Sequence, residues 1–166
     1  MTNMIRPGSD NIAAVKNDGT VVTPARASGC TLGVGTYYFP VGSSEAPTSS
    51  ETPLVSAHLK WAAAVAATIT VETCNFPAKV DSHVSGPTDV SDYDETAGNW
   101  ISENPTTAYV AVSGSGNSST AAVVTAGGTA AGGCTFHLGN LGTRRVRIKV
   151  VTTVGGVVRC GIAGKD

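Results

Sequence analysis

Val55-Ser-Ala-His-Leu-Lys-Trp61 decides the fold, because its apolar and polar side chains alternate without interruption. Successive side chains of a β-strand point to opposite sides of the sheet, so the odd-numbered residues share an apolar face and the even-numbered ones share a polar face. An antiparallel sheet with one face toward solvent requires this pattern, whereas parallel strands are usually covered on both faces. The stretch therefore predicts a half-buried strand of an antiparallel sheet.

Four further segments show the same alternation and predict further strands. Charged residues make up only 14% of the chain, 20 of the 166 residues are glycine, and valine and threonine are abundant, which is typical of sheet proteins. With turn residues at short intervals, these segments predict an all-β fold, an antiparallel β-sandwich of jelly-roll type with about eight or nine strands. The apolar positions of the four segments are Ala67, Ile69 and Val71; Ala108, Val110 and Val112; Cys134, Phe136 and Leu138; and Val146, Ile148 and Val150.

A chain of 166 residues is long enough for one domain with a core and too short for two ordinary domains. We predict an extended N-terminal arm over residues 1–24 and a single β-sandwich domain over residues 25–166. No apolar run reaches the ~18 residues that a membrane-spanning helix needs, and residues 1–10 lack the apolar stretch of a secretory signal. The predicted core consists of Val55, Ala57, Leu59, Trp61, Ile69, Val71, Val110, Phe136, Leu138, Val146, Ile148 and Ile162.

Two turn sequences predict hairpins. Asn17-Asp18-Gly19 separates two short apolar segments inside the N-terminal arm, and Gly155-Gly156 is expected to join the last two strands. In a hairpin with a two-residue loop, even-numbered residues would face odd-numbered ones, yet the apolar residues on both sides of Gly155-Gly156 are even-numbered. We therefore expect a one-residue bulge at Val150-Val151, or else a turn of odd length.

The motifs of common enzyme sites do not occur in the sequence. There is no Gly-x-Ser-x-Gly nucleophile motif, no Gly-x-x-x-x-Gly-Lys phosphate loop and no His-Glu-x-x-His metal motif. Asp81 and His83 could act as an acid–base pair, but two residues on alternate sides of an extended loop are weak evidence for catalysis. We therefore predict a non-enzymatic protein with no catalytic residue, no cofactor and no metal ion.

The four cysteines, Cys30, Cys74, Cys134 and Cys160, are far apart in the sequence. A zinc site needs clustered ligands such as a Cys-x-x-Cys pair, and the sequence has no such pair. Three of the four alternate with aliphatic residues in predicted strands. We therefore expect buried, reduced thiols rather than disulfides.

The charged residues are distributed unevenly along the chain. Six of the 12 acidic residues lie between residues 81 and 103, and six of the 11 basic residues lie at or after residue 144. We interpret the acidic segment as a solvated loop, because it lacks the regular ligand spacing of a calcium-binding loop. Arg145, Arg147 and Lys149 share one face of a predicted strand. That strand is either an edge strand that its charges protect from mispairing, or a face that meets the acidic loop of a neighbouring copy.

These residues leave several interpretations open. The acidic loop could also cover the basic strand of the same sandwich; if it contacts a neighbouring copy instead, charge reversal at Arg145 and Arg147 should dissociate the copies without unfolding them. Direct nucleic-acid binding is not expected, because no aromatic residues are interleaved with the basic ones. Trp100 either packs across the end of the sandwich or stacks on a sugar ring. The candidate interaction surface consists of Arg144, Arg145, Arg147, Lys149, Arg159, Asp92, Asp94, Glu95 and Trp100.

Several features follow one another over roughly residues 54–166. They are an apolar strand ending at Trp61, a strand with Thr70-Val71-Glu72, a long loop ending in Gly98-Asn99-Trp100, the stretch Thr135-Phe136-His137-Leu138-Gly139, and the basic strand Arg144–Val151 with its Gly-Gly turn. This order resembles the small β-sandwich proteins of bacteriophage particles, notably capsid cement or decoration proteins and related jelly-roll virion proteins.

The resemblance implies a virion protein on the capsid exterior that assembles in the host cytoplasm. Such a protein binds the shell of major capsid protein and forms a homo-oligomer, commonly a trimer. The N-terminal arm is suited to adding a strand to a neighbouring copy. The family has no fixed catalytic residues, so none is carried over to this chain.

The alternative function is that of a carbohydrate-binding β-sandwich module of a tail fibre or a secreted protein, because many such modules share tryptophan and glycine-rich turns. The positions of the aromatic side chains distinguish the two functions. A structural protein keeps most aromatic rings inside, whereas a sugar-binding module exposes several of them on one face or loop.

Overall fold

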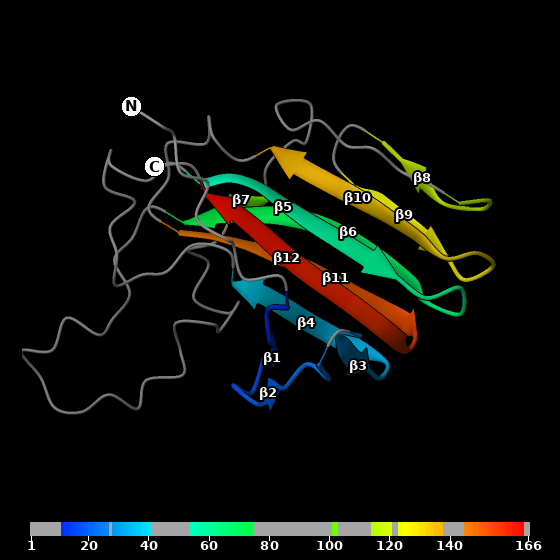
Figure 1. Ribbon diagram of the computed structural model, residues 1–166, viewed down its shortest axis with the longest axis horizontal. Coiled ribbons are helices and arrows are strands. Elements are labelled where there is room, and N and C mark those ends of the chain that lie inside the picture. The colour runs from blue at the N-terminus through cyan, green and yellow to red at the C-terminus, as the bar shows by residue number, and fades with distance from the viewer. Residues whose placement is uncertain are drawn as a thin grey trace, which may run out of the picture.

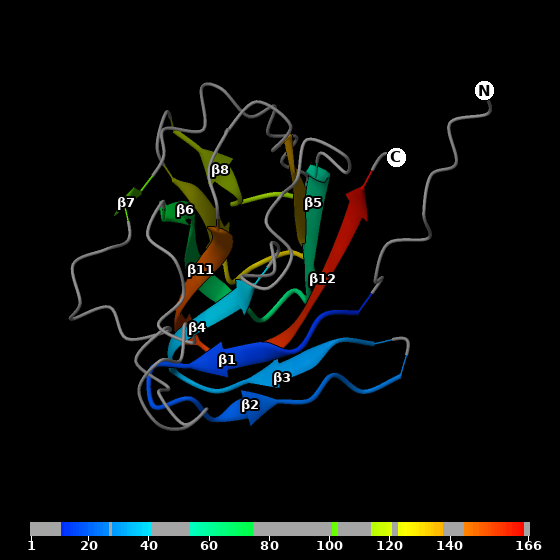
Figure 2. The ribbon, with the colours of Figure 1, turned by 90° about the vertical axis from the view of Figure 1, so that its left-hand side faces the viewer.

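A computed structural model of the chain describes residues 11–26, 28–40, 54–74, 101–102, 114–120, 123–137 and 145–164, and within these residues all regular structure is β-strand. Two antiparallel sheets pack face to face as a β-sandwich (Figures 1 and 2). The predicted all-β sandwich is confirmed.

The large sheet has eight strands in the order β2-β1-β4-β11-β6-β9-β8, with β7 also paired to β6. The small sheet has four strands in the order β10-β5-β12-β3. The strands of the large sheet are β1 (Ala14–Lys16), β2 (Val21–Val22), β4 (Gly35–Pro40), β6 (Ala66–Cys74), β7 (Ile101–Ser102), β8 (Ser118–Ser119), β9 (Val124–Gly127) and β11 (Arg145–Val154). Those of the small sheet are β3 (Cys30–Leu32), β5 (Leu54–Trp61), β10 (Gly132–His137) and β12 (Gly156–Gly164).

The core lies between the two sheets; it contains predicted residues and also others that were not predicted, among them Leu32, Tyr37 and Phe39. Of the predicted core residues, Ala57, Leu59, Trp61, Ile69, Val71, Phe136, Val146 and Ile148 are buried, and Ile162 packs against them half-buried. The side chains of Val55, Val110 and Leu138 lie outside the described part of the chain. The period-2 pattern therefore identified the inward face of β5, β6, β10 and β11 correctly.

The predicted N-terminal hairpin is confirmed. β1 and β2 pair across a turn in which the backbone N–H of Lys16 donates to the carbonyl of Thr20 at 2.9 Å. Gly19 has a φ of 80°, a left-handed conformation that favours glycine, and Asp18 accepts a hydrogen bond from the Thr20 N–H at 2.9 Å. β1 also pairs with β4, so this hairpin extends the large sheet of its own chain. Residues 1–10 of the predicted arm lie outside the described residues.

The predicted hairpin at Gly155-Gly156 is wrong, because β11 belongs to the large sheet and β12 to the small one. Gly155 is the point at which the chain crosses between sheets (Figure 2). The bulge expected at Val150-Val151 is wrong as well: both residues pair in continuous register with β6, and the irregularity falls between Thr152 and Val154. β11 and β12 lie in opposite sheets and both face the same core. Their even-numbered residues can therefore both point inward, and no bulge at Val150-Val151 is needed.

Candidate functional site

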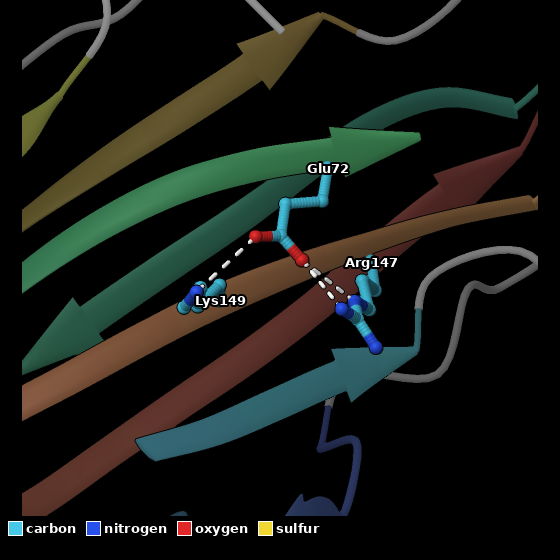
Figure 3. Close-up of polar contacts among 3 residues, drawn as sticks. All are labelled: Glu72, Arg147 and Lys149. Carbon is cyan, nitrogen blue, oxygen red and sulfur yellow. Dashed lines mark hydrogen bonds and ion pairs between the residues drawn. The ribbon is translucent and has the colours of Figure 1, made fainter. Parts of the chain in front are cut away.

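The main polar cluster of the described residues lies on the outward face of the large sheet (Figure 3). The strand register places Arg147 on β11 directly opposite Glu72 on β6, and Lys149 opposite Tyr38 on β4. Arg147 Nε donates to Glu72 Oε2 at 2.8 Å, and a terminal guanidinium nitrogen lies 2.7 Å from the same oxygen. Lys149 Nζ lies 3.4 Å from Glu72 Oε1. The guanidinium carbon of Arg147 is 4.0 Å from the centre of the Tyr38 ring, a cation–π contact.

This cluster is buried even though it lies on the outward face. The side chain of Arg147 is 1% exposed and that of Glu72 is 6% exposed, while Lys149 retains 25% exposure. Alternation shows which residues share a face and not whether that face is covered, so the burial of Arg147 could not be derived from it. Both carboxylate oxygens of Glu72 lie within ion-pair distance of cations of the same sheet.

The edge-strand interpretation of the basic segment is also wrong. β11 pairs with β4 on one side and β6 on the other, so it is an interior strand of the large sheet. Its basic residues therefore do not protect an open sheet edge. Arg147 links β11 to β6 through Glu72 and to β4 through the Tyr38 ring, and Lys149 makes a second contact with Glu72.

The structure separates the other residues of the predicted interaction surface. Arg159 lies on β12, in the small sheet, and so belongs to the opposite side of the sandwich from Arg147 and Lys149. Arg145 is placed in β11 opposite Cys74, but its side chain is not described. The remaining members, Arg144, Asp92, Asp94, Glu95 and Trp100, lie outside the described residues.

The outer face of the small sheet carries basic residues that sequence reasoning did not connect. Lys60 on β5 pairs directly with Arg159 on β12, and His58 follows on the same face of β5. His58 Nδ1 and Thr135 Oγ1 form a hydrogen bond of 2.9 Å. Partial burial, and then the positive charge of Lys60, lower the pKa of His58. The spacing of His58 and Lys60 was visible in the sequence, but their pairing with Arg159 depends on the order of the strands.

The described cysteine side chains are buried free thiols, as predicted: Cys30, Cys134 and Cys160. Burial raises the pKa of Cys134 to about 12, and burial together with the neighbouring thiols raises that of Cys160. Such thiols stay protonated at neutral pH and are poor nucleophiles and metal ligands. Among the described residues, no group of three or more His, Cys, Asp or Glu side chains is placed to hold a metal ion.

No protein-family model matches the chain, and comparisons with curated proteins and with solved structures likewise find no match. In the part of the chain that the structure describes, no helix is long and apolar enough to cross a membrane. The class of protein is therefore defined by the fold alone, as a β-sandwich of two packed antiparallel sheets.

Proposed function

We propose that the chain is a non-enzymatic structural protein of a bacteriophage particle, a capsid cement or decoration protein that binds the outside of the head and stabilises it. The two packed antiparallel sheets agree with the β-sandwich that the resemblance to phage virion proteins implies. With 14% charged residues and 20 glycines, the composition suits contacts made by the backbone and by shape.

The positions of the aromatic side chains carry this proposal over a carbohydrate-binding module. A sugar-binding module needs exposed rings on which sugars stack. In the part of the chain that the structure describes, every aromatic side chain is at most 3% exposed, which favours a structural role; these residues are Tyr37, Tyr38, Phe39, Trp61 and Phe136. Trp61 is also tied to a turn, because its indole N–H donates to Asn117 Oδ1 at 3.4 Å.

The proposed protein acts as a homo-oligomer, a trimer in the form that the resemblance implies, on the shell of major capsid protein. The charge distribution supports an assembly of this kind. Only two of the chain's 12 acidic residues, Asp18 and Glu72, lie in the described part, while six others lie between residues 81 and 103. Charges that are separated along one chain can neutralise each other between adjacent copies, which fixes their relative orientation.

The test is cosedimentation of the purified full-length chain with empty heads assembled from the major capsid protein of the same genome. Saturable binding at fixed lattice positions in cryo-electron micrographs, together with heads that resist heating better, is the expected result. Heads already saturated with the chain serve as the control. A chain that stays in the supernatant at saturating concentration overturns the proposal, and selective binding on a glycan array would favour the sugar-binding alternative.

A further inference from the structure

One end of the sandwich is built from loops that contain no charged residue, and we call it the uncharged end. Five loops lie there, on the right of the ribbon in Figure 1. None of their residues is Asp, Glu, Lys, Arg or His, and most are glycine or alanine. The loops are residues 33–34 between β3 and β4, 62–65 between β5 and β6, 114–117 before β8, 128–131 between β9 and β10, and Gly155 between β11 and β12.

These loops pack closely enough to form a single layer. At three of the contacts between them a glycine leaves no room for a side chain, because an added Cβ would lie 3.2 Å or less from the neighbouring segment. At a fourth contact a threonine hydroxyl donates to a backbone carbonyl oxygen at 3.1 Å. The uncharged end is therefore one continuous surface. In order across it, the contacts are Gly155 with the Leu32 carbonyl oxygen, Gly156 with the Val65 side chain, Gly128 with Ala66, and Thr129 with Ser115.

The side chains that this layer presents to solvent are apolar or small. Val34 is 75% exposed, and Val154, the last residue of β11, is 50% exposed. Residues 62–64, all alanine, are exposed as well. A partner that covers these loops removes apolar surface from water and does not have to remove water from a charge in them. Covering the uncharged end is therefore favourable.

Three long connections of the chain begin at the opposite end of the sandwich. β4, β6 and β10 start at the uncharged end and run away from it, to Pro40, Cys74 and His137 (Figure 1). The connections that follow these three residues therefore leave the sandwich at its far end. A partner can approach the uncharged end along the strands without meeting the points from which these connections start.

The size of the uncharged end limits what it binds. Four strands about 4.8 Å apart in each of two sheets about 10 Å apart give it an area on the order of 400 Å². A stable pair of proteins buries about 800 Å² on each partner, so two copies placed end to end would not form a stable dimer through this contact alone. A shell repeats the same surface many times, and copies linked in one oligomer bind it together, which multiplies a weak contact. The uncharged end therefore fits a repeating shell better than it fits a second copy.

We infer that the chain stands on the capsid shell through its uncharged end, and that the partner surface is an uncharged, apolar patch of the assembled major capsid protein. The exposed sides of residues 33–34 and 62–64 form the contact. A charged partner surface would have to bury its charges against loops that offer no counter-charge, which is unfavourable. The inference rests on the proposed function and specifies the surface through which it acts.

The experiment measures binding of the full chain to empty heads assembled from the major capsid protein of the same genome, by cosedimentation over a range of chain concentrations. Val34→Glu and Ala63→Glu should each weaken binding at least about 10-fold, because the new carboxylate would be buried without a partner. Circular dichroism verifies that each variant is folded. If Val34→Glu does not fold, Val34→Gln should show a smaller loss in the same direction.

Ile101→Glu is the matched control. Ile101 is also an exposed aliphatic residue, at 67%, and its substitution adds the same charge. It pairs with Thr73, near the end of β6 that lies far from the uncharged end, so this variant should bind heads as the wild type does. Equal binding of Val34→Glu, Ala63→Glu and Ile101→Glu overturns the inference.

Two further measurements identify the occupant of the uncharged end. Cryo-electron micrographs of decorated heads should show the ends of the strands against the shell; a face of either sheet in that place overturns the inference. Mass photometry of the free chains should give the same oligomeric state for Val34→Glu, Ile101→Glu and the wild type. A loss of self-association in Val34→Glu alone overturns the inference as well, because a second copy would then cover this end.

These outcomes also separate the inference from the proposed function. A wild-type chain that binds heads, with Val34→Glu and Ala63→Glu binding equally well, refutes only the docking through the uncharged end. A wild-type chain that binds no heads refutes the structural role itself, and the inference falls with it.

Discussion

Glu72→Ala tests whether the buried ion pair holds the middle of the large sheet together. The substitution removes the carboxylate that lies 2.8 Å from Arg147 Nε and 2.7 Å from a terminal guanidinium nitrogen. The Arg147 side chain, 1% exposed, then keeps its charge inside the protein without that carboxylate. Removing one partner of a buried pair costs about 3–5 kcal/mol. For a chain of 166 residues, a change of ~1 kcal/mol shifts the melting temperature by ~2–4 °C, so we expect a decrease of ~6–20 °C.

The free energy of unfolding is measured in urea with the fluorescence of the buried Trp61 as one probe, for Glu72→Ala, for Arg147→Met and for the double variant. Because the two residues interact, the double variant should lose less stability than the sum of the two single variants. Lys149→Met is the control, since its partly exposed ammonium group lies 3.4 Å from Glu72 and should contribute less than ~1 kcal/mol. A loss below ~1 kcal/mol in Glu72→Ala, or strict additivity in the double variant, would show that the pair does not stabilise the sheet.

Four further predictions concern the core, its thiols and the sheet crossing. Phe136→Ala should lower the free energy of unfolding by ~3–5 kcal/mol in urea melts, because it empties a buried position; an unchanged melt would place this ring outside the packed core. The pKa of Cys134 is raised from 9.0 to about 12, so its contribution to stability should be complete below about pH 9 and decrease as the pH rises toward 12, which urea melts between those limits measure. Intact-mass analysis after alkylation of the unfolded protein should show four free thiols; a bridged pair would instead indicate an exported protein. Gly155→Ala should destabilise the protein, because the added Cβ would clash with the Leu32 carbonyl oxygen. Gly33→Ala is the control: the nearest neighbour of its Cβ would be the Tyr37 hydroxyl at 3.4 Å, so it should melt almost as the wild type does.

The sequence predicted those features that depend on local chain geometry. Ala57, Leu59 and Trp61 are buried because alternate residues of any strand share a face, and Asn17-Asp18-Gly19 forms a turn because its residues suit the required backbone angles. Neither result requires knowledge of distant segments. Both could therefore be derived from neighbouring residues alone.

The features that the sequence predicted wrongly depend on long-range arrangement. A short glycine turn usually joins paired strands, but Gly155 connects strands of two different sheets, and no local signal states which sheet a strand joins. The evidence available in the sequence was that the apolar residues Ile148, Val150, Val158 and Cys160 are all even-numbered, so that residues on both sides of the turn face the core. A two-residue hairpin without a bulge does not allow this arrangement, whereas a crossing between sheets does. A parity conflict of this kind is therefore evidence for a sheet crossing as well as for a bulge.

The same long-range arrangement changes where contacts between copies should be tested. Reversing the charge of Arg147 would place two carboxylates directly opposite each other at a buried position, next to the Tyr38 ring, so Arg147→Glu should unfold the protein rather than dissociate intact copies. Loss of assembly in that variant would say nothing about an interface. The melting curve of Arg147→Glu is therefore measured beside that of the wild type. A lowered curve attributes any loss of assembly to the fold, whereas an unchanged curve would refute the buried role of Arg147.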